Sequence, residues 1–112
     1  MIDQVHPRDL PAWFEACGPD AAGVVLDVRE PWELQTAPVP TEGFTLVVIP
    51  MQQVPARLDE LDPSRPLACL CHHGMRSMQV AAFLHKRGFE RLANIAGGTE
   101  AWASVDARVA RY

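Results

Sequence analysis

The sequence predicts an α/β domain built on a mainly parallel β-sheet. Short apolar, β-branched runs recur along the chain, segments with helical spacing lie between them, and glycine or proline separates the two. Such alternation of strands and helices is typical of parallel sheets whose strands are joined by right-handed crossovers. At 112 residues, the chain is expected to form one domain over 1–112.

The first elements follow from local pattern. Residues 2–5 suit a short edge strand, and Pro7 suits the first turn of a helix that ends at residues 18–19, Gly-Pro. Residues 24–28 form an apolar, β-branched run that ends in charge, which predicts a central strand with Asp27 and Arg29 near its carboxyl end. Residues 36–44 contain two prolines and a glycine without any period, so we expect a loop there.

The remaining elements continue the alternation. Residues 45–49 predict a third strand, and Pro55 opens a helix that the Asp-Pro-Ser of residues 62–64 ends. The later predictions are a buried strand over 67–70, a helix over 77–87, a strand over 92–95, and a helix through Trp102 that follows two glycines. Residues 105–112 have weak periodicity and are expected to wrap the surface.

Residues 71–77 read CHHGMRS and join the strand at 67–70 to the next helix. A strand end, a tight loop and a helix start favour anion binding, because unpaired N–H groups and the helix dipole converge there. Gly74 permits the loop to curl, and Arg76 adds a permanent planar cation. A thiolate at Cys71 would be stabilised by these donors, so Cys71 is the candidate nucleophile.

The 71–77 loop resembles the active loop of single-domain rhodaneses, which carry sulfane sulfur as a cysteine persulfide. Three further stretches are similar to that family and follow in its order: DVREPWE at 27–33, IPM at 49–51, and NIAGG at 94–98. The resemblance implies a rhodanese-like, five-stranded, mainly parallel sheet flanked by helices. It also implies a sulfurtransferase that takes sulfur from thiosulfate or a persulfide and passes it to cyanide, a thiol or a protein, without metal or organic cofactor.

The resemblance assigns roles to the loop and to two residues outside it. Arg76 would hold the anionic part of the donor, while the amides of residues 72–77 would cradle the sulfur. For Ser77 we favour helix capping over direct contact with the persulfide. Asp27 and Arg29 are expected to support the loop, which a salt bridge at a strand end would also explain. The remaining substrate-binding candidates are His72, His73, Gly74 and Met75.

Two features leave alternatives open around this loop. Cys69 lies two residues before Cys71, on the same face of a strand, and is interpreted as a packing residue rather than a resolving thiol. A zinc site from Cys69, Cys71, His72 and His73 is disfavoured, since the four crowd one segment without paired spacing. Residues 37–43, APVPTEG, depart from the glycine-rich turn usual in the family.

Two other functions compete with sulfur transfer. Phosphatases or arsenate reductases of this fold use a longer loop, with five residues between cysteine and arginine where this chain has four. Rhodanese folds also occur as inactive binding or regulatory modules. Those modules often lack the cysteine, which this chain retains together with Arg76.

Composition and net charge limit the classes of partner and the cellular location that we expect for the chain. The chain is 48% hydrophobic and 21% charged, as in ordinary globular proteins, and its net charge of -4 gives no footprint for nucleic acid. No signal-peptide pattern or membrane-length apolar run is visible. Three cysteines do not suggest a disulfide framework. We therefore expect a cytoplasmic protein that binds neither nucleic acid nor membrane. The resemblance implies as partners a small sulfur donor, a thiol or cyanide acceptor and a sulfur-relay protein.

Overall fold

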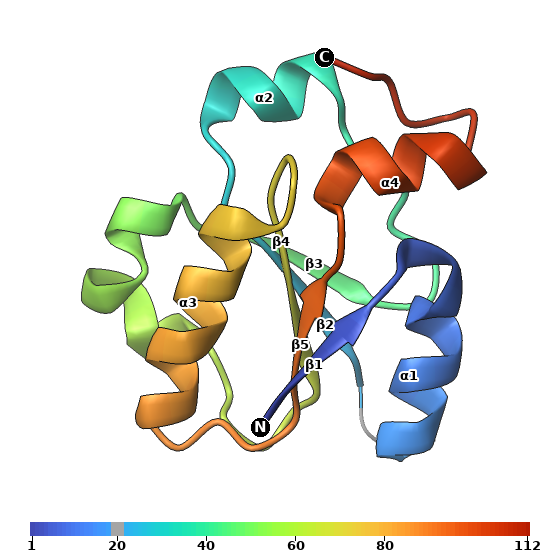
Figure 1. Ribbon diagram of the computed structural model, residues 1–112. Helices are drawn as coiled ribbons and strands as arrows, with labels where there is room; N and C mark the ends of the chain where they lie inside the picture. Colours follow the sequence, from blue (N-terminus) through green and yellow to red (C-terminus); the bar gives the residue numbers. More distant parts are fainter. Residues whose placement is uncertain (19–21) are drawn as a thin grey trace.

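The computed structural model describes residues 1–18 and 22–112 and confirms the α/β class. Its sheet holds five strands in the order β1-β5-β4-β2-β3, and every pairing is parallel (Figure 1). All five predicted strands are present, with residues 2–5 at an edge of the sheet as expected. The strands are β1 (Ile2–Val5), β2 (Val24–Asp27), β3 (Thr45–Val48), β4 (Leu67–Leu70) and β5 (Leu92–Ile95).

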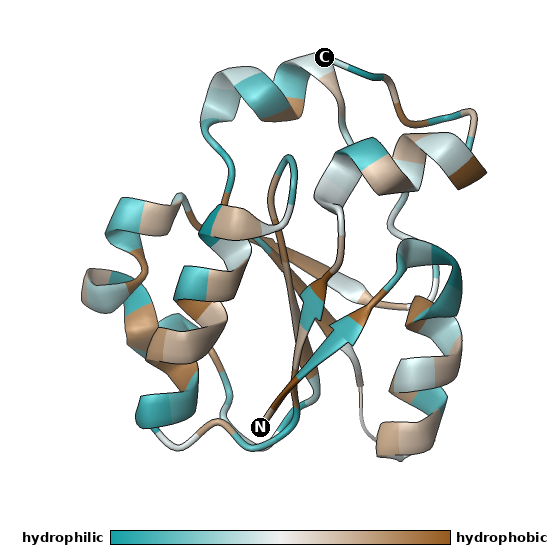
Figure 2. Ribbon diagram, viewed as in Figure 1, coloured by the Kyte–Doolittle hydropathy of each residue, from teal (hydrophilic) through white to brown (hydrophobic). Residues whose placement is uncertain are grey.

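The three inner strands are buried along their whole length, whereas the edge strands expose part of theirs. Helices on both faces of a parallel sheet exclude water from its middle, which is why β2 and β4 consist almost entirely of apolar residues. Figure 2 shows apolar colour along most of the inner strands and a mixture of hydrophilic and apolar residues along the helices.

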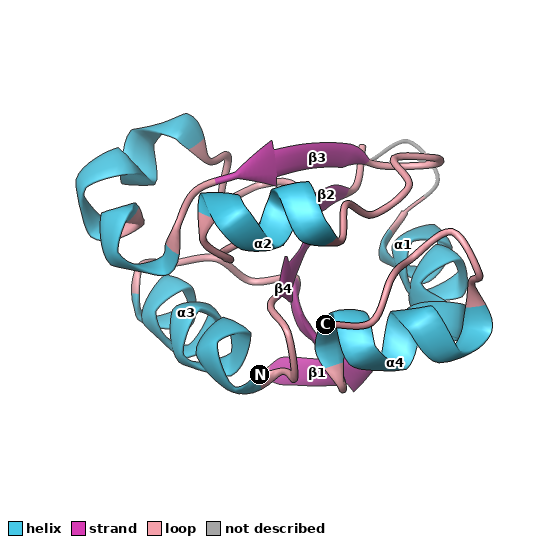
Figure 3. Ribbon diagram, turned by 90° about the horizontal axis from the view of Figure 1, so that it is seen from above, coloured by secondary structure: helices cyan, strands magenta, loops and turns pink. Residues whose placement is uncertain are grey.

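Helical segments cover the two faces in separate layers (Figure 3). On one face, α1 (Leu10–Cys17) and α4 (Gly98–Val105) pack through Leu10, Phe14 and Trp102. On the other face, α3 (Met75–Lys86) packs through Val80 and Leu84 beside the 3-10 turns Met51–Gln53 and Pro55–Glu60. The short helix α2 (Pro31–Thr36) lies above the carboxyl edge of the sheet (Figure 1).

Several helix boundaries differ from the prediction. Pro7 opens a 3-10 turn, Pro7–Asp9, before α1 begins. The helix ends at Gly18 with φ of 131°, while Pro19 lies outside the described residues. The helix predicted at Pro55 is a 3-10 segment, because the backbone of Arg57 leaves helical angles.

Helix α2 lies in a segment where the sequence pattern predicts no helix. Its apolar spacing is poor, so periodicity gave no signal. Two local signals were present: Pro31 occupies the first helical turn, and Glu30 and Glu33 form a reciprocal capping box. This helix matters because it carries Glu33 to the carboxyl edge of the sheet.

The prediction that residues 105–112 merely wrap the surface is wrong. Val109 is buried in the layer formed by α1 and α4, and Tyr112 returns to α2 and the 71–77 loop. Figure 1 shows the C-terminal end lying beside α2. Among the described residues, no helix combines the length and apolar character needed to cross a membrane.

Candidate functional site

The 71–77 loop stands at the carboxyl end of β4, the middle strand of the sheet. Cys71 follows the last residue of β4, and Gly74 precedes the first residue of α3. Gly74 has φ of 98°, a conformation that costs other residues free energy. The loop therefore turns back on itself and holds the Cys71 side chain only 1% exposed.

Two backbone amides of the loop donate to the sulfur of Cys71. The N–H of Gly74 lies 3.1 Å from Sγ, and the N–H of Ser77 lies 3.3 Å from it. Both amides belong to the start of α3, where helical N–H groups have no partner within the helix. Negative charge on Sγ is stabilised by these donors and by the helix dipole.

The side chain of Ser77 also contacts the sulfur, which corrects the prediction that it caps the helix. Gly74 is the N-cap of α3, and Ser77 sits fully buried one turn into the helix. Its hydroxyl donates to Oδ1 of Asn94 at 2.5 Å and lies 3.2 Å from Sγ of Cys71. The Ser77 hydroxyl is therefore held by Asn94 within hydrogen-bond distance of the sulfur.

Asn94 is a site residue to which the sequence analysis gave no role. It belongs to β5, where the rest of the strand is apolar. Its amide nitrogen donates to the carbonyl of Gly74 at 3.1 Å and to Gln4 at 3.0 Å, which points Oδ1 at Ser77. A buried polar residue in an apolar strand was the signal that could have identified it.

Helix α4 fixes the loop from the other side. The N–H of Thr99 donates to the carbonyl of Cys71 at 3.0 Å, and that of Glu100 donates to the carbonyl of His72 at 3.1 Å. A Cβ at Gly98 would lie 2.3 Å from the Cys71 carbonyl oxygen. The backbone of residues 97–98 therefore passes close to the loop, and the carbonyls of Cys71 and His72 are both engaged by α4.

Arg76 does not point into the ring of donors around Cys71. Its guanidinium makes two hydrogen bonds to Glu33 of α2, Nη1 to Oε1 at 2.7 Å and Nη2 to Oε2 at 2.8 Å. Glu33 is 3% exposed and also accepts from the N–H of Glu30 and the hydroxyl of Tyr112. Hydrogen bonding to Arg76 lowers the pKa of Glu33 to about 2, and the same bond raises the pKa of Arg76.

Asp27 and Arg29 form a second ion pair, and neither side chain is exposed. Nε and Nη2 of Arg29 donate to the two carboxylate oxygens of Asp27 at 2.9 and 2.8 Å. The remaining Nη1 of Arg29 donates to the hydroxyl of Tyr112 at 3.3 Å. The pair thus closes the end of β2 and supports the tail that contacts the loop.

The two histidines of the loop form a stack with the tail. The ring of His72 lies between His73 at 3.9 Å and Tyr112 at 3.8 Å, measured between ring centroids. Burial lowers the pKa of His72, and the neighbouring His73 lowers it further. His72 therefore favours the neutral form, and Nε2 of its ring is buried without a hydrogen-bond partner among the described residues.

Cys69 is fully buried in β4, and it packs in the same cluster of core residues as Cys71. Burial raises the pKa of its thiol, which keeps it protonated. The structure thus confirms the packing interpretation of Cys69. In the part of the chain that the structure describes, no cluster of three or more His, Cys, Asp or Glu side chains has the arrangement of a metal site.

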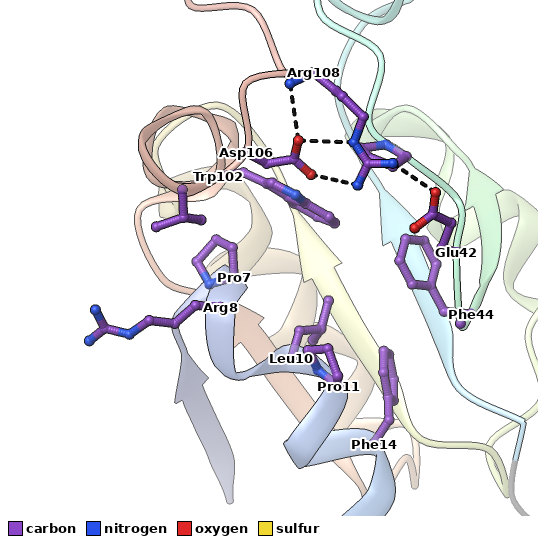
Figure 4. A pocket seen from close by; sticks show the side chains of 13 residues that line it. Pro7, Arg8, Leu10, Pro11, Phe14, Glu42, Phe44, Trp102, Asp106 and Arg108 are labelled. Atoms are coloured by element: carbon purple, nitrogen blue, oxygen red, sulfur yellow. Dashed lines mark hydrogen bonds and ion pairs between the residues drawn. The ribbon is translucent and has the colours of Figure 1, made fainter.

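A pocket of about 290 Å³ lies apart from the loop, between α1, α4 and residues 40–44 (Figure 4). Phe14, Phe44 and Trp102 form part of its wall. At its rim, Arg108 bridges Asp106 and Glu42, so the atypical turn at 37–43 is tied to the tail. The turn therefore shapes this pocket, and none of the residues lining the pocket belongs to the 71–77 loop.

Comparison with known proteins decides the family. The model of the rhodanese-like domain matches residues 7–105, which includes the loop and the two ion pairs. The chain belongs to the rhodanese-like domain family. The solved rhodanese-like domain protein from Staphylococcus aureus has the same fold, with a TM-score of 0.76, 22% identity and 99% coverage of both chains.

Sulfurtransferases are among the relatives of this rhodanese-like chain. A sulfurtransferase from Allochromatium vinosum is 32% identical over 80 residues, which cover 71% of this chain and 71% of that protein. The chloroplastic rhodanese-like/PpiC domain-containing protein 12 from Arabidopsis thaliana is 39% identical over 93 residues. The match covers 79% of this chain but only 30% of the plant protein. The family is thus that of rhodanese-like sulfurtransferases.

Proposed function

We propose that the chain is a sulfurtransferase in which Cys71 carries sulfane sulfur as a persulfide. One observation carries the proposal. Sγ of Cys71 lies at the carboxyl edge of the sheet and accepts hydrogen bonds from two backbone amides at the start of α3, at 3.1 and 3.3 Å. A nucleophilic thiolate needs this kind of stabilisation. No metal or organic cofactor enters the reaction.

The reaction has two balanced steps. In the first, the Cys71 thiolate attacks the outer sulfur of the donor, the donor's sulfur–sulfur bond breaks, and the bonding pair leaves with sulfite from thiosulfate or with a thiolate from a persulfide. In the second, an acceptor attacks the outer sulfur of the persulfide, and the Cys71 thiolate leaves. Cyanide would give thiocyanate, and a thiol or a sulfur-relay protein would give a new persulfide.

The other loop residues would surround the transferred sulfur. Gly74 and Ser77 supply the amide donors, and His72, His73 and Met75 belong to the same loop, where donor and acceptor would approach. Asp27 and Arg29 act indirectly, by holding the strand end and the tail. Arg76 also acts indirectly, because its guanidinium is held in the ion pair with Glu33.

The position of Arg76 weighs against a phosphatase. A phosphatase loop of this type needs its arginine to grip the phosphate, whereas Arg76 is engaged by a buried carboxylate. The presence of Cys71 with its two amide donors weighs against an inactive binding module.

Intact mass spectrometry tests the proposal. Reduced protein is exposed briefly to thiosulfate or to a small organic persulfide and is then treated with cyanide. We expect the wild type to gain the mass of one sulfur and lose it as thiocyanate appears. Cys71→Ser should gain none, while Cys17→Ser, a matched control at a partly exposed free cysteine, should behave like the wild type. A wild type that accepts sulfur from no donor would overturn the proposal.

A further inference from the structure

The charged side chains around the loop are paired with one another. Arg76 is bound by Glu33 through two short hydrogen bonds, and Arg29 is bound by Asp27 in the same bidentate way. Each pair carries one positive and one negative charge. Arg76, which belongs to the loop, and Arg29 therefore bring almost no net charge to the site. A bidentate pair with a buried carboxylate is also costly to open.

Glu33 holds its negative charge firmly. It accepts from the N–H of Glu30 at 3.0 Å and from the hydroxyl of Tyr112 at 2.7 Å, in addition to the two bonds from Arg76. These donors, with Arg76 the strongest, keep the pKa of Glu33 far below neutral pH. Arg76 therefore faces an ionised partner at neutral pH.

The histidines of the loop do not replace the missing charge. His72 is packed between two rings, and its burial favours the neutral imidazole. His73 is on the outer, exposed side of the stack, where water screens any charge that it carries. The amides of Gly74 and Ser77 are already directed at Sγ of Cys71.

Two large apolar side chains are exposed at positions next in sequence to the residues of the Arg76–Glu33 pair. Trp32, next to Glu33, is 61% exposed, and Met75, next to Arg76, is 77% exposed. The Trp32 ring meets Tyr112 edge-on at 5.9 Å between centroids, so it is part of the same surface as the tail. Large exposed apolar side chains beside a site favour the binding of an organic ligand, whose carbon atoms can contact them.

We propose that the donor read by this site is an organic persulfide, R–S–SH, rather than thiosulfate. This inference rests on the proposed function and specifies its donor. In the first half-reaction the Cys71 thiolate attacks the outer sulfur, the S–S bond of the donor breaks, and the bonding pair leaves with the R–S⁻ thiolate. The proton stays on the transferred sulfur. Thiosulfate is a dianion with no carbon. The paired arginines leave its charge without a partner, and it has no carbon atoms to contact the exposed apolar side chains.

Rates of sulfur loading on Cys71 test the inference with three donors of graded charge. As R–S–SH, N-acetylcysteine amide persulfide is uncharged and N-acetylcysteine persulfide carries one negative charge on its carboxylate, whereas thiosulfate carries two. Each rate constant is divided by that of the same donor with a free small thiol, which removes intrinsic reactivity. We expect the amide persulfide to exceed thiosulfate at least about tenfold, the size of one lost charge-assisted contact.

Two variants change the charge of this site by independent routes. Glu33→Gln removes the partner of Arg76, and Met75→Lys adds a cation at an exposed position where folding is little affected. Both should raise the ratio of thiosulfate loading to persulfide loading by about tenfold. Glu60→Gln is the matched control, because it frees Arg57 in an exposed pair on another part of the surface and should leave the ratio unchanged.

The outcomes separate the two proposals. If no donor loads Cys71, the proposed function fails and the inference fails with it. If thiosulfate loads the wild type as fast as the amide persulfide, or if neither folded variant shifts the ratio, sulfur transfer stands and the inference is overturned. Met75→Lys decides alone if Glu33→Gln does not fold. A peptide that carries the same persulfidated cysteine identifies the source: faster loading from it points to a protein donor, slower loading to a small metabolite, and both uphold the inference.

Discussion

Glu33 shows how a single residue joins the parts of this site. Its two carboxylate oxygens collect hydrogen bonds from α2, α3 and the tail, although the side chain is almost fully buried. A buried carboxylate is stable only when its charge and lone pairs are satisfied, and here four donors do so. Loss of the Glu33 charge should therefore lower the free energy of unfolding of the whole chain.

Glu33 makes stability depend on pH in the acid range. Its pKa falls from an ordinary value of 4.5 to about 2 on folding, so its contribution is complete above pH 4.5 and is lost as the pH falls through about 2. The wild type should lose on the order of 3 kcal/mol more than Glu33→Gln between these limits. Urea unfolding of both proteins at a series of pH values measures this difference. Parallel acid dependence in the two would contradict the prediction.

At the scale of elements, the start of α4 shapes the loop that precedes α3. The two segments are far apart in sequence, yet Thr99 and Glu100 donate to the carbonyls of Cys71 and His72. Those bonds require a backbone approach that only glycine permits at position 98. The geometry around the sulfur therefore depends on α4 as much as on the loop itself.

Gly98→Ala should destabilise the protein and disturb sulfur loading together. The new Cβ would lie 2.3 to 2.5 Å from backbone atoms of Cys71 and His72, at φ of 58°. We expect a loss of roughly 2 to 5 kcal/mol in unfolding free energy from overpacking and strain. Loading of Cys71 should slow in the protein that remains folded.

Gly43→Ala is the control for this substitution. Gly43 also has a positive φ, of 83°, but a Cβ there meets nothing within 4 Å. It should cost only about 1 to 2 kcal/mol and leave loading unchanged. Equal effects of the two substitutions on loading would show that α4 does not position the loop.

At the scale of the whole molecule, the C-terminal tail runs from the last helix, α4, back to the carboxyl edge of the sheet. Tyr112 donates to Glu33, accepts from Arg29 and covers the ring of His72. It therefore links α2, the end of β2 and the loop. A change at this residue should be detected at His72.

Tyr112→Ala should raise the pKa of His72. Burial is the main cause of its lowered value, because desolvation disfavours the imidazolium, so removal of the covering ring restores water and moves the pKa up toward 6.5. NMR titration of the histidine ring protons measures this. Tyr112→Phe keeps the stacked ring and should leave the value low. An unchanged pKa in the alanine variant would mean that His73 and the loop bury His72 without the tail.

Much of the fold and the centre of the site could be predicted from sequence, because they rest on local pattern. Continuous apolar runs specify buried parallel strands, and a cysteine between a strand and a helix start specifies where Sγ meets free amides. Cys71, Gly74 and the packing role of Cys69 follow from such neighbours. Helix α2 escaped detection because a six-residue helix with an exposed Trp32 has little periodicity.

The partners of the charged and polar side chains were decided only by the tertiary structure. Arg76 meets Glu33 across 43 positions, Tyr112 meets Glu33 across 79, and Ser77 meets Asn94 across 17. Periodicity carries no information on which distant side chains share a space, since long-range pairing is set by how the elements pack. The sequence alone therefore determined the sheet and the loop that carries the proposed nucleophile, whereas packing determined the charge around Cys71 and with it the donor that we propose.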